Sequence, residues 1–407
     1  MATSTGTALQ DLLVGAHLAG PDDLPGLIAA AGAGHGARET IVYVIDYDQV
    51  VLMPLTADQP IVRQPIAVDG TLAGRAFTEV TAYETAADDA TTLWVPILDA
   101  TERLGVMEMC FPPSRGVDDT LRDECFALGS LVAELLISRT VYGDSLERAR
   151  RRWPHSVPAE LQWTQLPPLT FATPRVAIAG ALVPTHEVAG DSFDYAVNGD
   201  VAHIAIVDAL GHGLEATLLS AVAIAAMRNA RRSGLSLVDS VRSIDKHIAA
   251  EFGEDKFVTG IVGELDTRTG VWRWVNAGHP PALIVREGRV VKSLDAEVNP
   301  PLGLLGEVPE VGQERLQPGD RLLLHSDGVI EARNADGEFF GTQRLVDFVT
   351  REAAGERPAP ETLRRLMLAI LNHQGGELQD DATTLLVEWM GDEPRRLVAQ
   401  TTPSLVS

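Results

Sequence analysis

The sequence predicts an α+β protein made of two domains, and three observations support this fold class. The chain has 407 residues, more than one ordinary domain contains. In both halves, apolar runs occur in pairs around polar turns, which is the pattern of β-hairpins. The helical patterns of the second half come in pairs instead of alternating with single strands, which disfavours a doubly wound parallel sheet.

The composition is that of a soluble globular protein, with 45% hydrophobic and 22% charged residues. The formal net charge of -24 argues against nucleic acids and anionic membranes as partners. No apolar run reaches the roughly 18 residues of a membrane-spanning helix, and no signal-peptide pattern opens the chain. Cys110 and Cys125 are the only cysteines, which excludes a disulfide framework and a cysteine zinc cluster. We therefore expect a cytoplasmic protein.

The N-terminal part, residues 1–117, is predicted to be a small domain with an antiparallel sheet. The predicted elements are strands at 41–45, 50–53, 93–98 and 104–109 and a short helix at 72–77. The stretches "DGTLAGRAF" and "LWVPILDATERLGVMEM" occur on these elements, and in this order they resemble a GAF domain. The resemblance covers about residues 15 to 140 and implies an α/β sensory module. Two roles stay open, namely binding of a small-molecule ligand and a purely structural or dimerising role.

Residues 118–169 are predicted to form a helical linker. Apolar residues recur there at helical spacing, namely Leu121, Cys125, Leu128, Val132 and Leu135, then Tyr142, Leu146, Ala149 and Trp153. Either a single helix packed on its own domain or a two-helix coiled coil between protomers fits this spacing. The register is longer than a typical globular helix, which favours the coiled coil and predicts a homodimer through residues 118–153. The following prolines mark the entry into a new domain, and the segment 159–169 is predicted to pack onto its surface.

The C-terminal part, residues 170–390, is predicted to be a second α+β domain. Its predicted strands are 175–183, 201–207, 257–265, 271–276, 282–286, 321–326 and 383–389, and its predicted helices are 214–232, 236–252, 343–354 and 360–373. Strands in hairpin-like runs with paired helices favour two sheets packed on each other with the helices outside. Residues 391–407 are predicted to be a disordered tail.

Acidic residues of this domain stand where predicted strands meet turns. They are Asp191, Asp194, Asp208, Asp327 and the doublet Asp380–Asp381. Taken singly, an aspartate beside a glycine is ordinary turn chemistry. Several carboxylates without neighbouring cations in the sequence would repel one another unless a hard cation bound them. Oxygen ligands favour Mg²⁺ or Mn²⁺ over zinc, and two such ions roughly 3.5–4 Å apart can orient a phosphoryl group.

The motifs around these residues resemble one family closely. They are "GDSFDY", "VDALGHGLEA", "VNAGHPPALI", "PPLGLL", "LQPGDRLLLHSDGVIEARNADGEFFG" and "DDATTLLV". In order and spacing they resemble the metal-dependent serine/threonine phosphatases of the PP2C superfamily, in the branch of SpoIIE and RsbU. The resemblance implies a PP2C-type α-β-β-α sandwich, two Mn²⁺ or Mg²⁺ ions and attack by a hydroxide without a covalent intermediate. It also implies a phosphorylated anti-anti-sigma factor of the STAS type as substrate.

The same resemblance assigns the metal ligands. Asp191 matches the ligand of the first motif, Asp208 the aspartate that bridges both ions, and Asp327 the third carboxylate. Ala209 is expected to contribute its backbone carbonyl. Asp380 matches the last carboxylate, with Asp381 as the alternative, and a third ion is left open. His212 and His279 are expected mainly to hydrogen-bond within the structure, and Asn276 to secure the turn before His279.

The sequence departs from the family pattern in two places. Ala189 stands where a glycine usually precedes Gly190, and no arginine is placed to hold the phosphate. Two other functions fit the sequence less well. The spacing from Asp208 to Gly213 is one residue too long for the glycine box of a histidine-kinase-like ATPase. A sensory adaptor without activity would be favoured by the loss of a carboxylate, but all are present.

Overall fold

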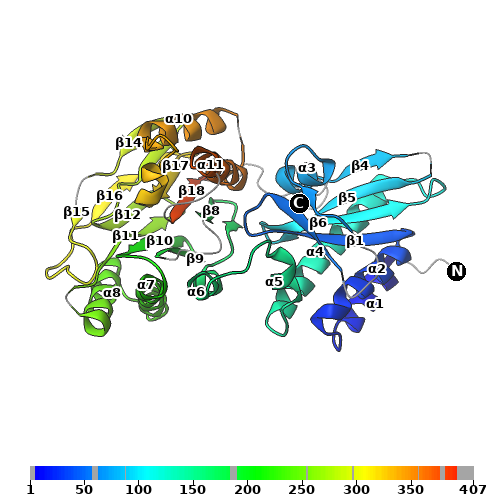
Figure 1. The fold of residues 1–407 in the computed structure, drawn as a ribbon, viewed down its shortest axis with the longest axis horizontal. Helices are drawn as coiled ribbons and strands as arrows, with labels where there is room; N and C mark the ends of the chain where they lie inside the picture. Colours follow the sequence, from blue (N-terminus) through cyan, green and yellow to red (C-terminus); the bar gives the residue numbers. More distant parts are fainter. Residues whose placement is uncertain are drawn as a thin grey trace. The chain divides into compact units, whose positions relative to one another are not determined.

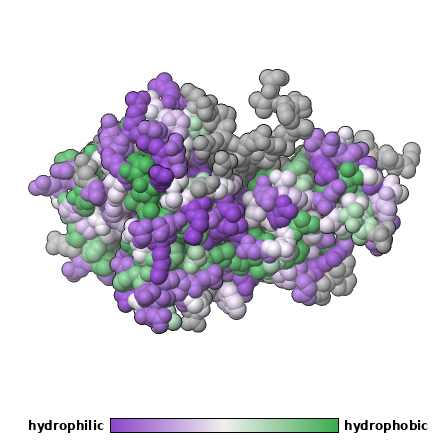
Figure 2. Space-filling view, turned by 90° about the horizontal axis from the view of Figure 1, so that it is seen from above, coloured by the Kyte–Doolittle hydropathy of each residue, from purple (hydrophilic) through white to green (hydrophobic). Residues whose placement is uncertain are grey.

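The computed structural model describes residues 5–56, 63–87, 89–183, 190–253, 255–295, 298–355, 357–375 and 381–391. The chain forms two compact units, and the boundary between them falls between Trp153 and Pro154 (Figure 1). This boundary divides the segment 118–169, which the sequence suggested as a linker. None of the helices in the described ranges is long and apolar enough to cross a membrane. Hydrophilic residues cover much of the face in Figure 2, with hydrophobic residues in small groups between them.

The first unit is built on a six-stranded antiparallel sheet in the order β3-β2-β1-β6-β5-β4. The strands are β1 (Glu39–Ile45), β2 (Val51–Leu55), β3 (Ile66–Ala67), β4 (Tyr83–Ala86), β5 (Thr91–Asp99) and β6 (Glu102–Phe111). The helices are α1 (Thr5–Gly15), η1 (Pro21–Asp23), α2 (Leu24–Gly34), α3 (Leu72–Glu79), α4 (Asp119–Thr140) and α5 (Ser145–Arg150). Both predicted hairpins and the short helix are confirmed. One core joins the sheet to α1, α2 and α4, and a smaller one joins it to α3.

Helix α4 corrects the coiled-coil prediction. The residues predicted to form the seam, from Leu121 to Leu135, are buried in the core of their own unit. The helix ends at Thr140, and Tyr142 is 74% exposed, so the register does not continue to Trp153. Just beyond, a Cβ on Gly143 would lie 2.8 Å from the ring of Pro21, which shows how closely the chain turns back there. The coiled coil is therefore wrong. The stretch packs on its own domain, as the alternative expected, but as two helices, α4 and α5, instead of one. Helical spacing predicts a buried stripe but does not identify what covers it.

The second unit contains two six-stranded sheets. One has the order β15-β12-β11-β10-β9, with β16 also paired to β12, and the other has the order β14-β13-β17-β18-β8-β7. The strands are β7 (Thr170–Ala172), β8 (Val176–Val183), β9 (Asp191–Asn198), β10 (Val201–Ala209), β11 (Val258–Asp266), β12 (Val271–Ala277), β13 (Leu283–Arg286), β14 (Arg289–Ser293), β15 (Val298–Asn299), β16 (Gly312–Arg315), β17 (Arg321–His325) and β18 (Ala382–Trp389). The helices are α6 (Val157–Gln165), α7 (Leu214–Arg232), α8 (Leu237–Phe252), α9 (Asp327–Glu331), α10 (Gly341–Ala354) and α11 (Ala359–His373).

The two sheets pack face to face and each outer face carries helices, as Figure 1 shows. The alternation of side chains along β10 explains this arrangement. Ile204 and Ile206 enter the core between the sheets, whereas Ala205 and Val207 enter the core under α7 and α8. Helices α10 and α11 cover the other sheet. The predicted sandwich of two sheets with helices outside is therefore confirmed.

One segment of the second unit differs from the prediction and another agrees with it. The stretch beginning at Asp191, for which no strand was predicted, is strand β9. Its carboxylates at Asp191 and Asp194 are buried, so they give the strand a polar sequence that resembles a turn. Trp163 of helix α6 and Leu166 just after it pack against the core between the two sheets, as predicted for the segment 159–169.

Candidate metal centre

The first two predicted ligands face each other on neighbouring strands. Asp191 is the first residue of β9 and Asp208 the penultimate residue of β10, and the antiparallel register pairs their Cα atoms. Directly opposite residues on one face of a sheet have Cβ atoms only about 4.5–5.5 Å apart. The register therefore brings two carboxylates together at one end of the sheet.

The glycine-rich loop after β10 lies against this pair. A Cβ on Gly190 would lie 3.2 Å from the carbonyl oxygen of Ala209 and 3.3 Å from that of Gly211, which is tighter than most side chains allow. Gly211 and Gly213 have φ angles of 93° and 74°, which glycine adopts most easily. The backbone carbonyl of Ala209 therefore lies beside Gly190, the residue before Asp191, and α7 begins directly after the loop.

The third predicted ligand comes from the opposite sheet. Asp327 is exposed at the first position of α9, immediately after β17 and Ser326. The Ser326 amide donates to the Thr383 carbonyl at 2.9 Å, and the Thr383 amide donates to Ser326 Oγ at 3.0 Å. A Cβ on Gly328 would lie only 1.8 Å from the carbonyl oxygen of Asp381, so only glycine fits. Asp327 is thus held beside the start of β18.

Asp381 holds the backbone of the first motif. Its Oδ2 accepts from the amide of Gly190 at 2.5 Å and from the amide of Asp191 at 3.3 Å. These bonds join segments about 190 residues apart and fix the position of Asp191. Asp380, the preferred last ligand, lies outside the described residues.

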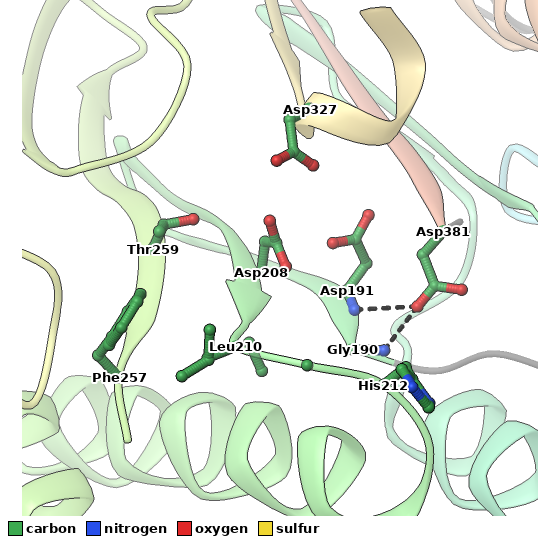
Figure 3. Close-up of a pocket in the computed structure, with 11 residues that line it drawn as sticks. Gly190, Asp191, Asp208, Leu210, His212, Phe257, Thr259, Asp327 and Asp381 are labelled. Carbon is green, nitrogen blue, oxygen red and sulfur yellow. Dashed lines mark hydrogen bonds between the residues drawn. The ribbon is translucent and has the colours of Figure 1, made fainter. Parts of the chain in front are cut away.

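The acidic side chains surround a cavity of about 590 Å³. Figure 3 shows the carboxylates of Asp191, Asp208 and Asp327 turned toward one another, while Asp381 faces the backbone of Gly190 and Asp191. Asp191 is 3% exposed, and its Oδ2 has no hydrogen-bond partner in the described part of the chain. Burial, and then the charges of Asp208 and Asp381, raise the pKa of Asp191 well above its usual range. An anionic site of this kind is stabilised by a bound cation.

The donor set fits Mg²⁺ or Mn²⁺. Asp191, Asp208 and Asp327 offer only oxygen atoms, and Asp191 keeps a buried oxygen that needs a partner. Within the described ranges, no group of three or more His, Cys, Asp or Glu side chains is arranged to hold a metal ion. Mg²⁺ usually keeps several of its waters and is held by one or two carboxylates, so an open arrangement suits it.

Asp194 is not part of this centre, which corrects its grouping with the other acidic residues. It lies inside β9 and is 1% exposed. One of its oxygens accepts from Arg228 at 2.7 Å and the other from Arg231 at 2.7 Å, both on α7. The nearest cations in space are more than thirty residues away in the sequence, so the sequence alone gave no sign of them.

The two histidines differ in their surroundings. His212 is exposed on the wall of the cavity. His279 is 4% exposed, and its Nδ1 lies 3.0 Å from Oγ1 of Thr259. Asn276 donates to the His279 carbonyl at 2.9 Å and accepts from its amide at 2.8 Å, which confirms the predicted role of Asn276.

Thr259 is a residue of this site that the sequence reasoning missed. It lines the cavity, and its Cα pairs with that of Asp208 across β10 and β11. The predicted strands 201–207 and 257–265 gave no register. Had the pairing of these strands been known, Thr259 would have been found opposite Asp208.

The comparison with protein families agrees with this geometry. Residues 198–390 match the family described as Stage II sporulation protein E (SpoIIE). This match spans slightly less than half of the chain. The matched segment includes Asp208, Asp327 and Asp380, whereas Asp191 precedes it.

Individual proteins are similar to parts of this chain. Phosphoserine phosphatase RsbP of Bacillus subtilis is 30% identical over 36% of this chain and 37% of its own length. Phosphoserine phosphatase RsbU of Bacillus subtilis is 22% identical over 52% of this chain and 62% of its own length. The chain thus spans less than two thirds of either relative. A solved structure of RsbU and RsbW domains from Mycobacterium tuberculosis is 27% identical, covers 54% of this chain and 62% of that chain, and gives a TM-score of 0.46.

Proposed function

We propose that this chain is a Mn²⁺- or Mg²⁺-dependent phosphatase that hydrolyses phosphoserine and phosphothreonine in proteins. The carrying observation is the convergence of Asp191, Asp208 and Asp327 on one cavity from β9, β10 and α9. The SpoIIE-family match and the similarity to two proteins named phosphoserine phosphatase support this activity.

The proposed metal ligands are Asp191, Asp208, Asp327 and Asp380, together with the backbone carbonyl of Ala209. Bound Mn²⁺ or Mg²⁺ would activate water and neutralise the charge on the phosphoryl group. The chain's own part is to hold these oxygens in place. Asp381 does so by fixing the backbone of Asp191, and Gly328 by allowing α9 to approach β18.

The lining of the cavity favours attack by water over a covalent intermediate. Among the described residues that line it, Thr259 has the only hydroxyl, and none is Ser or Cys. Thr259 is paired with His279, an arrangement that resembles a nucleophile with its base. Burial, followed by the nearby His325, lowers the pKa of His279 to about 3. So weak a base does not activate a hydroxyl, and Thr259 is left as a polar wall of the site.

The proposed substrate is a phosphorylated anti-anti-sigma factor of the STAS type, and the support for it is the resemblance to the SpoIIE and RsbU branch. No Arg or Lys occurs among the described residues that line the cavity, so phosphate binding would depend on the metal ions. Removal of the phosphate would release a sigma factor through partner switching.

We also propose that the first unit is a GAF-like sensory domain that regulates the phosphatase, with a small-molecule ligand as one means of control. Its six-stranded antiparallel sheet with helices on both faces supports this proposal. A homodimer through residues 118–153 would have to use exposed side chains such as Val141 and Tyr142, because the stripe on α4 is buried.

The deciding experiment is hydrolysis of a phosphoserine peptide by the full chain, with and without Mn²⁺, beside the Asp208→Asn variant. We expect turnover that needs Mn²⁺ and is lost in the variant. Mn²⁺-independent turnover, or equal turnover in the variant, would refute the proposed chemistry. The same assay on a chain that starts at Pro154 measures regulation by the first unit, and an unchanged rate would refute that part.

A further inference from the structure

Asp191 lies on an edge of its sheet, so its outward backbone groups have no strand to pair with. Strand β9 is last in the order β15-β12-β11-β10-β9. The backbone N–H and C=O of Asp191 both bond to side chains instead of to β10. On an edge strand, the outward N–H and C=O groups need hydrogen-bond partners from outside the sheet.

Two side chains from distant segments satisfy these groups. Asp381 Oδ2 accepts from the Asp191 amide, and Gln162 Nε2 donates to the Asp191 carbonyl at 2.6 Å. Gln162 is 2% exposed and belongs to α6. Its other polar atom, Oε1, is buried without a hydrogen-bond partner in the described ranges. A buried amide oxygen without a hydrogen bond costs free energy. Gln162 is buried in spite of this cost.

Helix α6 is joined to β9 at a second point. Nη2 of Arg228 donates to the Gln165 carbonyl at 2.6 Å and to the Asp194 carboxylate at 2.7 Å. The first and fourth residues of β9 are therefore both connected to α6, one through an amide and one through a guanidinium. In Figure 1, α6 lies beside α7, which carries Arg228.

Helix α6 is the first helix after the boundary between the two units. The helix begins at Val157, three residues after the boundary between the two units, and Ser156 caps it by accepting from the Ala159 amide at 3.3 Å. Pro158 in its first turn fixes the backbone at the entry. Any displacement of the segment that enters the second unit would thus act on α6 first, and through Gln162 on the backbone of Asp191.

We infer that Gln162 is a positioning residue for the metal centre, and that α6 sets the metal affinity of the site through it. This inference rests on the proposed function. Gln162 touches neither substrate nor metal and acts only through the Asp191 backbone. Loss of such an outer hydrogen bond weakens metal binding by about tenfold or more in known sites. We expect a comparable rise in the Mn²⁺ concentration needed for half-saturation, with little change in kcat once Mn²⁺ is saturating.

The test uses full-length protein and the variants Gln162→Met and Gln162→Glu. Met keeps the length of the side chain without a donor, and Glu keeps its shape but replaces the donor by an acceptor and adds a negative charge. Gln165→Met is the matched control. It makes the same change on the same helix and keeps the hydrogen bond from Arg228 to the Gln165 backbone carbonyl. Mn²⁺ binding is measured directly by the electron paramagnetic resonance of free Mn²⁺, beside peptide hydrolysis and metal-free thermal unfolding.

We expect both Gln162 variants to bind Mn²⁺ about tenfold more weakly than wild type and the Gln165→Met control to bind as wild type does. The metal-free melting temperature shows which variants are folded, and the Glu variant carries the test if the Met variant unfolds. Unchanged Mn²⁺ affinity in a folded Gln162 variant, or an equal loss in the control, would overturn the inference and leave the phosphatase proposal standing. A wild-type chain that neither binds Mn²⁺ nor hydrolyses the peptide would overturn both.

Discussion

Gly328→Ala would test the geometry of the metal centre without altering any proposed ligand. The new Cβ would lie 1.8 Å from the Asp381 carbonyl oxygen, whereas an ordinary contact begins at 3.4 Å, so α9 and β18 must separate by about 1.6 Å. Asp327 precedes Gly328 on α9 and would move with it. A misplacement of about 1 Å costs roughly a hundredfold in rate, and a forced overpacking costs about 1–3 kcal/mol of stability.

We therefore expect kcat/KM on a phosphoserine peptide to fall about a hundredfold or more, with weaker Mn²⁺ binding. The melting temperature should fall by roughly 2–12 °C, since 1 kcal/mol corresponds to about 2–4 °C in a unit of this size. Gly355→Ala is the matched control in the same unit, because its Cβ meets no atom closer than 3.4 Å and its φ is -81°. Activity of Gly328→Ala close to that of the control would show that this contact does not position Asp327.

The remaining predictions distinguish a proposed metal ligand from residues that stabilise the fold. Asp208→Asn should abolish Mn²⁺-dependent hydrolysis while the melting temperature stays near wild type; activity that survives in this variant removes Asp208 from the centre. Asp194→Asn should instead destabilise the fold by about 3–5 kcal/mol in denaturant unfolding, because it leaves two arginines without their carboxylate, and a neutral result would contradict that role. The lowered pKa of His279, about 3, means that it contributes stability above pH 6.5 that is lost as the pH falls toward 3. At pH 5 this loss amounts to about 2 kcal/mol, and His279→Gln should flatten the slope of unfolding free energy against pH; parallel curves would refute it. Leu128→Ala should cost about 2–5 kcal/mol with an unchanged mass by light scattering, whereas a smaller mass without lost stability would favour an intermolecular role.

Hydrophobic spacing found most of the helices and strands because burial on one face is a local property of the sequence. Helix α7, predicted at 214–232, was found with the same bounds. Strand β9 was missed because a buried aspartate interrupts the apolar pattern on each of its faces. Asp191 shares a face with the buried Phe193 and Tyr195, and Asp194 lies on the opposite face. Charges that are paired or bound in the fold resemble solvent-exposed charges in the sequence.

The sequence by itself indicated the oxygen ligands of the proposed centre, because these aspartates stand in motifs that resemble those of the phosphatase family and such ligands favour a hard cation. It also determined that α4 has one buried stripe. Only the tertiary structure decided that this stripe faces its own sheet, and that Asp194 is neutralised by α7 while Asp191 is not. It alone placed Thr259 opposite Asp208 and Gln162 against the Asp191 carbonyl. The physical reason is that these are contacts between residues far apart in the chain. Periodicity shows that a side chain needs a partner, whereas strand register and sheet packing select which one it receives.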